Sequence, residues 1–456
     1  MTPRQFCIKL GIAATVLAAN LGTAWADGPH VDSYHPPPER DASAEKMGVS
    51  ASFIRDIDHI SVLEISGNYD RDVGGQVNLE ARRAVSRAFY EHHQDNFDFL
   101  VVFTGFEFNT GNAVAFHIGV QNQIQGLGLP IYNQTAEWGS DGRLKGWTDM
   151  AALSRYEPNP LNADFDRTLS ILAHELMHQW CCRFDFERPG DPAPQDGLLG
   201  LDDVHWSYLF DSDASVMFGN DWLDLGDGTF KSVDVFTFYG PLDLYAAGFL
   251  PADQVPELLL IDNPEVDPDL PQQLGAVVSG AATTVRLDDI VRAEGPRIPA
   301  AADAQKEFRA GFIYLIQEGA PIFSNHLRQI EDIRQAFIQR FSIMTGGQGV
   351  MEIYPSDEPT GTTGEPEPVD GGTLRPTADV DLAVAWLRDQ QAGDGSWQDR
   401  PGSRLRDTQV ALATLLTLAP SFDPAAAAVW LGDESSDHVD AFARRGLAKD
   451  RLGLDA

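Results

Sequence analysis

Basic residues are scarce in this 456-residue sequence. Lys and Arg total 33 against 68 Asp and Glu, which gives a formal net charge of −35. A protein that binds nucleic acid needs a basic face to neutralise phosphates, so we expect no nucleic-acid partner. The same charge disfavours docking on an anionic membrane surface.

Cysteine is also scarce, with three residues in the whole chain. Three cysteines cannot build a disulfide framework, so the fold must depend on its apolar core. Cys181 and Cys182 are adjacent, and they can form a vicinal disulfide or remain two small core residues at the end of a helix. We favour the second arrangement, because adjacent residues on a helix point in different directions.

Long apolar runs are missing except at the N-terminus. There, Arg4 and Lys9 precede an apolar stretch at 10–21, and Ala-Trp-Ala at 24–26 provides a cleavage pattern of small residues. This arrangement predicts a signal peptide over 1–26. No later stretch is apolar enough to span a bilayer. We therefore expect an exported protein, secreted, periplasmic or extracellular, without a transmembrane anchor.

The chain contains 43% hydrophobic residues, enough for a substantial core. We expect a Pro-rich tether or propeptide at 27–50, a main domain at 51–250, an accessory α/β region at 251–354, a linker at 355–377 and a helical tail at 378–456. The linker has too few apolar residues to offset the entropy of ordering. The expected fold class is α+β.

Hydrophobic periodicity predicts the elements of the two regions. The expected strands are 59–65, 99–104, 113–120 and 146–153, and the expected helices are 77–93 and 166–180, the latter capped by Asp164 or Asp166. In the accessory region we expect a strand pair, 276–287 with 309–316, followed by a helix at 325–345.

The helix at 166–180 carries the sequence His174-Glu175-Leu176-Met177-His178, an HExxH motif. Residues four apart share a helix face, so both imidazoles can reach one metal ion. Zinc prefers such nitrogen ligands and lowers the pKa of a bound water to about 7. Glu175 can then take a proton from the attacking water and pass it to the leaving amine. The other interpretation is a helix with two incidental histidines.

A third ligand must come from another part of the chain. Glu187 is the only glutamate between Glu175 and Glu257, and it follows the helix too closely to be a good candidate. His205 is the only histidine between His178 and His326, and we expect it to complete the site. If His205 is not the ligand, an aspartate must replace it, from among Asp202, Asp203, Asp211 and Asp243.

In these residues the chain resembles the metzincin metalloproteases, and within them the leishmanolysin-like branch. The matching positions are His174, Glu175 and His178, then His205-Trp206, then Met217. The resemblance implies that the three histidines bind one Zn²⁺, that Glu175 is the catalytic base and that Met217 forms a hydrophobic floor. It also implies a zincin-like domain, a twisted mixed sheet with an active-site helix, over about 55–250. Cys181 stands where the family usually has glycine.

Other polar residues near the motif have less specific roles. Asp243, in an expected short helix at 239–248, is a candidate structural partner, and Tyr208 or Tyr239 can donate a hydrogen bond to an oxyanion. The stretch 224–228 (DLGDG) can bind Ca²⁺, but such clusters are more often simple turns.

The tail resembles a repeat of the α/α toroids of terpene cyclases and prenyltransferases. It carries a helix-like segment, then QAGDGSW at 391–397, then a second helix-like segment after Asp407. One repeat and part of a second cannot close a toroid, so we expect no cyclase activity.

Two hypotheses follow from the sequence. The first is a secreted zinc endopeptidase that acts on a peptide or protein substrate. The alternative is a zincin-like extracellular binding module without catalytic activity. Nothing in the sequence fixes the oligomeric state.

Overall fold

The computed structural model describes residues 48–352 except 75, 161 and 189, together with 33–34, 388, 391–393 and 396. The chain divides into two compact units, Met1–Asp357 and Glu358–Ala456. The expected signal peptide, linker and nearly all of the tail lie outside the described residues, as does most of the tether at 27–50.

The described part of the first unit mixes helices with several sheets, which confirms the α+β class. Its α-helices are α1 (Leu79–Tyr90), α2 (Ala163–Met177), α3 (Pro241–Ala247), α4 (Leu287–Glu294) and α5 (Ser324–Met344). No helix among the described residues is both long and apolar enough to cross a membrane.

The larger sheet has eight strands in the order β1-β7-β10-β6-β19-β3-β2, with β20 paired to β19. These strands are β1 (Ser33–Tyr34), β2 (Ser50–Ile57), β3 (Ile60–Ser66), β6 (Phe99–Thr104), β7 (Phe116–Gly119), β10 (Gly146–Ala152), β19 (Glu307–Gln317) and β20 (Val350–Glu352). The central strands β10, β6, β19 and β3 are parallel neighbours. Strands β7 and β2 are antiparallel to β10 and β3, respectively.

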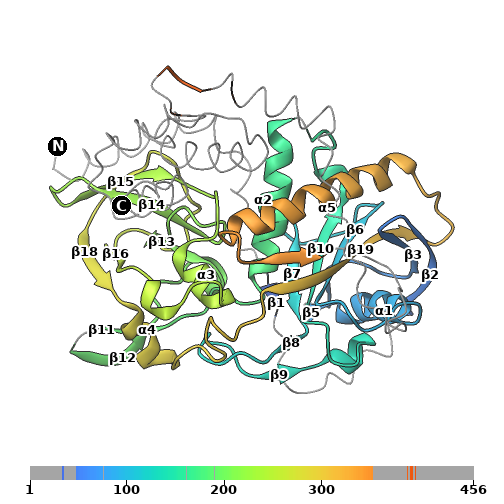
Figure 1. Cartoon of the computed structure of the whole chain (residues 1–456), viewed down its shortest axis with the longest axis horizontal. Helices are drawn as coiled ribbons and strands as arrows, with labels where there is room; N and C mark the ends of the chain where they lie inside the picture. The colour runs from blue at the N-terminus through green and yellow to red at the C-terminus, as the bar shows by residue number, and fades with distance from the viewer. Residues whose placement is uncertain are drawn as a thin grey trace, which may run out of the picture. The chain divides into compact units, whose positions relative to one another are not determined.

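The sequence of strand β6 shows that both faces of this sheet are covered. Its sequence, FLVVFT, is apolar throughout, which is typical of a parallel strand buried on both sides. Successive side chains point to opposite faces. Phe99, Val101 and Phe103 pack in the core that includes α2 and α5, whereas Leu100 and Val102 pack in the core that includes α1. The sheet therefore lies between α1 and the pair α2 and α5 (Figure 1).

Strand β19 places the region after residue 250 inside this fold. It lies between β6 and β3, parallel to both, and all of its residues from Ala310 to Ile316 are buried. The structure therefore differs from the boundary expected at residue 250, because 251–354 supplies a central strand of the main sheet. A long apolar strand needs neighbours on both sides, and periodicity alone does not say which strands those are.

The smaller sheet has six strands in the order β17-β15-β14-β13-β16-β18. They are β13 (Trp206–Asp211), β14 (Phe218–Asp224), β15 (Thr229–Asp234), β16 (Leu258–Asp262), β17 (Val277–Ser279) and β18 (Ala281–Val285). The expected pairing of 276–287 with 309–316 is wrong: 277–285 pairs with β15 and β16 here, whereas 309–316 lies in the larger sheet.

Three two-stranded sheets complete the described strands. They are β4 (Asp72–Val73) with β5 (Gln76–Val77), β8 (Gln121–Asn122) with β9 (Tyr132–Asn133), and β11 (Phe186–Arg188) with β12 (Asp191–Gln195).

Helix α2 starts three residues earlier than the pattern predicts. Its N-cap is Asn162, whose side chain accepts a hydrogen bond from the Asp164 backbone N–H at 3.1 Å. Asp164 and Asp166 therefore are not the cap; they lie in the first turn, where a negative charge is favourable at the positive end of the helix. The helix ends at Met177, so His178 is its C-cap residue.

The cap assignment gives the first testable prediction. Asn162→Ala should lower the free energy of unfolding by about 1 kcal/mol, because the N–H of Asp164 loses its acceptor. Asp164→Asn should cost only about 0.3 kcal/mol, since it alters an exposed charge and no cap. Urea denaturation of the two variants and the wild type measures both values. A larger loss for Asp164→Asn than for Asn162→Ala would contradict the assignment.

Candidate metal centre

Two histidines of the HExxH motif lie together at the carboxyl end of α2. His174 is in the last turn and His178 caps the helix, and their Nε2 atoms are 3.1 Å apart. The apolar residues of the same helix, including Leu172 and Leu176, are fully buried and fix its orientation against the sheet. The helical spacing therefore brings the two rings to one point, as the motif predicts.

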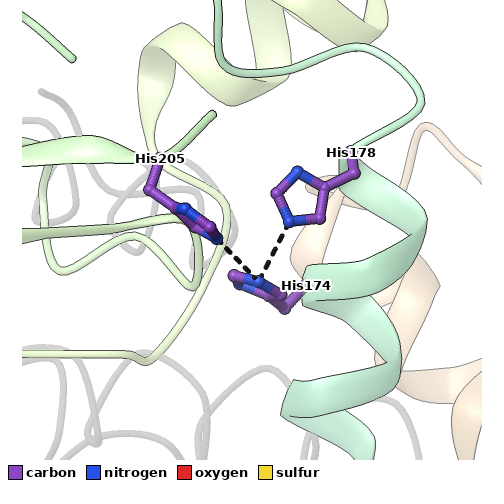
Figure 2. A group of neighbouring side chains, drawn as sticks. All are labelled: His174, His178 and His205. Atoms are coloured by element: carbon purple, nitrogen blue, oxygen red, sulfur yellow. Dashed lines mark hydrogen bonds between the residues drawn. The ribbon is translucent and has the colours of Figure 1, made fainter. Parts of the chain in front are cut away.

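His205 reaches the same point from a different part of the fold. It directly precedes β13, in the smaller sheet, and its Nε2 lies 3.3 Å from Nε2 of His174. Figure 2 shows the three rings pointing toward one another, two from α2 and one from the opposite side. Ligand atoms of the three residues all lie within 4.8 Å of one another. The structure thus brings together the three histidines that the sequence proposes as ligands.

Hydrogen bonds at the far side of two rings define where their lone pairs point. His174 Nδ1 lies 2.6 Å from the carbonyl oxygen of Val216, and His205 Nδ1 lies 2.9 Å from that of Leu201. A carbonyl oxygen only accepts, so each Nδ1 carries the hydrogen. In the neutral rings each Nε2 then presents a lone pair, and the two lone pairs face one another. This is the arrangement expected of histidines that bind a metal through Nε2.

The two distances from Nε2 of His174 to the other Nε2 atoms fit a tetrahedral zinc ion. With Zn–N bonds of 2.0–2.1 Å, two ligands of a tetrahedral ion are about 3.3 Å apart. The observed separations of 3.1 and 3.3 Å match this value. Unlike the other two rings, His178 makes no hydrogen bond from its buried Nδ1 to a described residue. Burial, followed by the nearby His174 and His205, lowers the pKa of His178 well below its usual value, which favours the neutral ring that a metal requires.

Glu175 follows His174 in sequence and is similarly buried. His178 and His205 are 0% exposed, His174 is 1% and Glu175 is 2%. The charge of Glu175 acts on Tyr156, whose pKa is raised first by burial and then by this carboxylate. The Tyr156 hydroxyl donates to the Met150 carbonyl oxygen at 2.6 Å. The carboxylate that follows His174 in sequence is thus buried, as the three imidazoles are.

Met217 lies in the turn that contacts the histidines, but the residue that stacks on a histidine ring is its neighbour Phe218. Met217 is fully buried, and its carbonyl oxygen accepts a hydrogen bond from the Trp206 backbone N–H at 2.8 Å. Phe218 stacks on His205 at 4.5 Å between ring centroids and lies 5.5 Å from His174. Sequence reasoning missed Phe218, although its position directly after the expected floor residue was an available signal.

The turn that carries Met217 has an unusual backbone. Asp213, Ala214 and Phe218 have φ values of 63°, 54° and 75°, in the region that side chains other than glycine rarely adopt. Ser212 supports the turn, because its hydroxyl donates to the Phe218 carbonyl oxygen at 2.7 Å. Such a conformation persists only when the surroundings fix it, which is common at functional sites.

None of the four aspartates considered as replacements for His205 joins the three-histidine group. Asp243 is fully buried, and burial raises its pKa to about 6. It accepts hydrogen bonds from Trp206 and Ser215, so its role is that of the structural partner suggested from the sequence.

The hydroxyl of Tyr239, one of the two candidate oxyanion donors, donates to the Ala173 carbonyl oxygen at 2.9 Å and so binds the backbone of α2.

Cys181 and Cys182 form a disulfide across a cis peptide bond, so the expectation of two separate thiols is wrong. The expectation assumed that the helix continues through these residues, with adjacent side chains pointing apart. Helix α2 instead ends at Met177, which leaves the dipeptide outside the helix.

The hairpin between β14 and β15 contains the stretch 224–228, for which Ca²⁺ was considered. Asp224 accepts a hydrogen bond from the Gly226 N–H at 2.8 Å, and Asp227 accepts one from the Thr229 N–H at 3.0 Å. Within the described residues, no group of three His, Cys, Asp or Glu ligands forms at this hairpin. The two carboxylates therefore act as turn residues.

The chain was also compared with known proteins. It matches no model of a protein family, no curated protein and no solved structure.

The geometry of the centre gives the second prediction. The protein should bind one Zn²⁺ per chain, and His205→Ala should weaken binding by more than about 100-fold, beyond the 10- to 100-fold typical of changes outside the ligand sphere. Competition with a coloured chelator measures the affinity, and elemental analysis measures the stoichiometry.

His92→Ala is the matched control, because His92 is exposed and lies in a turn after α1. It should leave zinc affinity unchanged. Equal affinity of His205→Ala and the wild type would show that His205 is not a ligand.

Proposed function

We propose that this protein is an exported, zinc-dependent endopeptidase with a zincin-like fold. The observation that carries the proposal is the meeting of three buried histidines, with Nε2 of His174 at zinc-ligand spacing from the other two Nε2 atoms and Glu175 next to His174 in sequence. A carboxylate adjacent to a three-histidine centre is the combination that zinc hydrolases use. Peptide or protein is the proposed substrate class.

Each residue has a defined part in the proposed reaction. His174, His178 and His205 hold the ion, and the carbonyl groups of Val216 and Leu201 keep two of the rings in the correct tautomer. Zinc, when bound, polarises the peptide carbonyl and lowers the pKa of water to about 7. Glu175 accepts a proton from the attacking water on its carboxylate and delivers that proton to the leaving amine. Phe218 closes one side of the site with an apolar ring and so limits access of water.

Two features support the rest of the proposal. The signal-like sequence at 1–26 and the disulfide between Cys181 and Cys182 both suit an oxidising compartment outside the cytoplasm. The mixed sheet with α2 on one face is compatible with a zincin-like catalytic domain, and the order His174, Glu175, His178, His205, Met217 motivates the metzincin assignment.

One observation favours the alternative function, a binding module that retains a structural metal. The three histidines and Glu175 are at most 2% exposed, whereas a substrate must reach the reacting groups. In this alternative the ion stabilises the junction between the two sheets, and Glu175 has no catalytic part.

A single substitution tests the mechanism and separates the two functions. Glu175→Gln keeps the size of the side chain but removes the base. Zinc content should remain at one per chain, and kcat/KM for a peptide library should fall by about 100- to 10,000-fold.

Full peptidase activity of the zinc-loaded Glu175→Gln variant would refute the proposed role of Glu175. If wild-type protein binds zinc but cleaves no peptide in the library, the binding-module function is correct.

A further inference from the structure

One buried carboxyl group contacts several of the segments that carry the metal site. Asp243, in the first turn of α3, accepts a hydrogen bond on Oδ1 from Trp206 Nε1 at 2.7 Å. Its Oδ2 accepts from the Ser215 hydroxyl at 2.5 Å and from the Gly240 N–H at 2.7 Å. Trp206 is the residue directly after His205. The first contact therefore fixes the start of β13, where the third histidine lies.

The second contact extends to the histidines of α2. The Ser215 hydroxyl, which donates to Asp243, accepts a hydrogen bond from the Met217 N–H at 2.8 Å. Val216 lies between these two residues, and its carbonyl oxygen accepts a hydrogen bond from Nδ1 of His174. The position of this carbonyl sets the orientation of the His174 ring, so Asp243 influences that ring through Ser215.

The third contact involves the segment that follows His178. Sγ of Cys181 is 3.5 Å from Oδ1 of Asp243. Cys181 is three residues after His178, and it is joined to Cys182 by the disulfide. The backbone that leaves α2 therefore packs against the same carboxyl group. His205 and His178 are thus one and three residues in sequence from a residue that contacts Asp243. His174 is hydrogen-bonded to Val216, in the turn that Asp243 supports through Ser215.

These contacts are all inside the protein. Asp243, Ser215 and Cys181 are 0% exposed and Trp206 is 2% exposed. A buried carboxyl group costs free energy unless it is well hydrogen-bonded, and three donors here supply the compensation. Because each donor has its own fixed place in the backbone, the carboxyl group also fixes the distances between the segments.

We propose that Asp243 is the positioning residue of the three-histidine centre: it sets the separation of the Nε2 atoms without contacting any of the three rings. It does so through Trp206, Ser215 and Cys181. The inference rests on the metal centre of the proposed function and does not depend on hydrolysis.

Two substitutions remove the donors one at a time, and each has a matched control. Trp206→Phe removes the Nε1–H donor to Asp243. Trp222→Phe removes an equally buried indole donor, which bonds to the Tyr208 carbonyl oxygen at 3.0 Å. Ser215→Ala removes the hydroxyl donor, and Ser232→Ala removes a buried hydroxyl that bonds to Asn220 at 3.2 Å.

The readouts are the zinc dissociation constant of the full chain, by chelator competition, and the melting temperature of the zinc-free protein. Trp206→Phe and Ser215→Ala should each weaken zinc binding by about 10- to 100-fold, the range typical of groups that orient metal ligands. The controls should change zinc affinity by less than about threefold while they lower the zinc-free melting temperature as much as the test variants do. Asp243→Asn should weaken zinc binding at least as much as either single change. Donors face both oxygens of Asp243, so the amide NH2 group that replaces one oxygen meets a donor and cannot accept its hydrogen bond.

The outcomes distinguish this inference from the proposed function. Equal zinc affinity in test and control variants would overturn the positioning role, even if the protein is a peptidase. A wild type that binds zinc but cleaves nothing would refute the peptidase function, while the difference between test and control variants would still support the positioning role. A wild type that binds no zinc would overturn both.

Discussion

The candidate metal site depends on bringing three buried imidazoles, from two distant parts of the chain, to one point. Nδ1 of His174 and Nδ1 of His205 each donate to a carbonyl oxygen, so in the neutral rings the two Nε2 atoms, 3.3 Å apart, present lone pairs to one another. Two lone pairs directed at one another repel, and the low dielectric of a buried site strengthens that repulsion. A divalent ion would relieve this repulsion, because it can accept nitrogen lone pairs at this spacing. The surrounding fold is best understood as the frame that keeps these rings in place.

That frame has two parts, and each supplies different histidines of the candidate site. The eight-stranded sheet and its helices hold α2, and hence His174 and His178, against a large apolar core. The six-stranded sheet supplies His205 at the start of β13 and Phe218 at the start of β14. The two parts meet at the turn before Phe218 and at Asp243. Rigid elements on both sides are suitable for a metal site, because small displacements of a ligand weaken binding.

The sequence predicted the local elements well where a pattern was long and regular. The expected strand at 99–104 and the expected helix at 325–345 agree with β6 and α5 to within about one residue, since continuous burial and helical spacing are strong signals. Spacing also predicted that His174 and His178 would share a helix face. The convergence of His205 followed from elimination and resemblance, because no local pattern reports contacts between distant segments. For the same reason the central place of β19 and the Asp243 network were not predictable, and the helix end that allows the Cys181–Cys182 disulfide was placed too late.

Strand β1 has a consequence for how this protein tolerates handling. Ser33 and Tyr34 pair with His117 and Ile118, so the short N-terminal strand covers the outer edge of β7. An uncovered edge offers unsatisfied N–H and C=O groups to any extended chain and is a template for aggregation. Removal of residues 33–34 would therefore expose the unpaired backbone groups of β7 as a new sheet edge, and the trimmed protein would be more prone to associate through that edge.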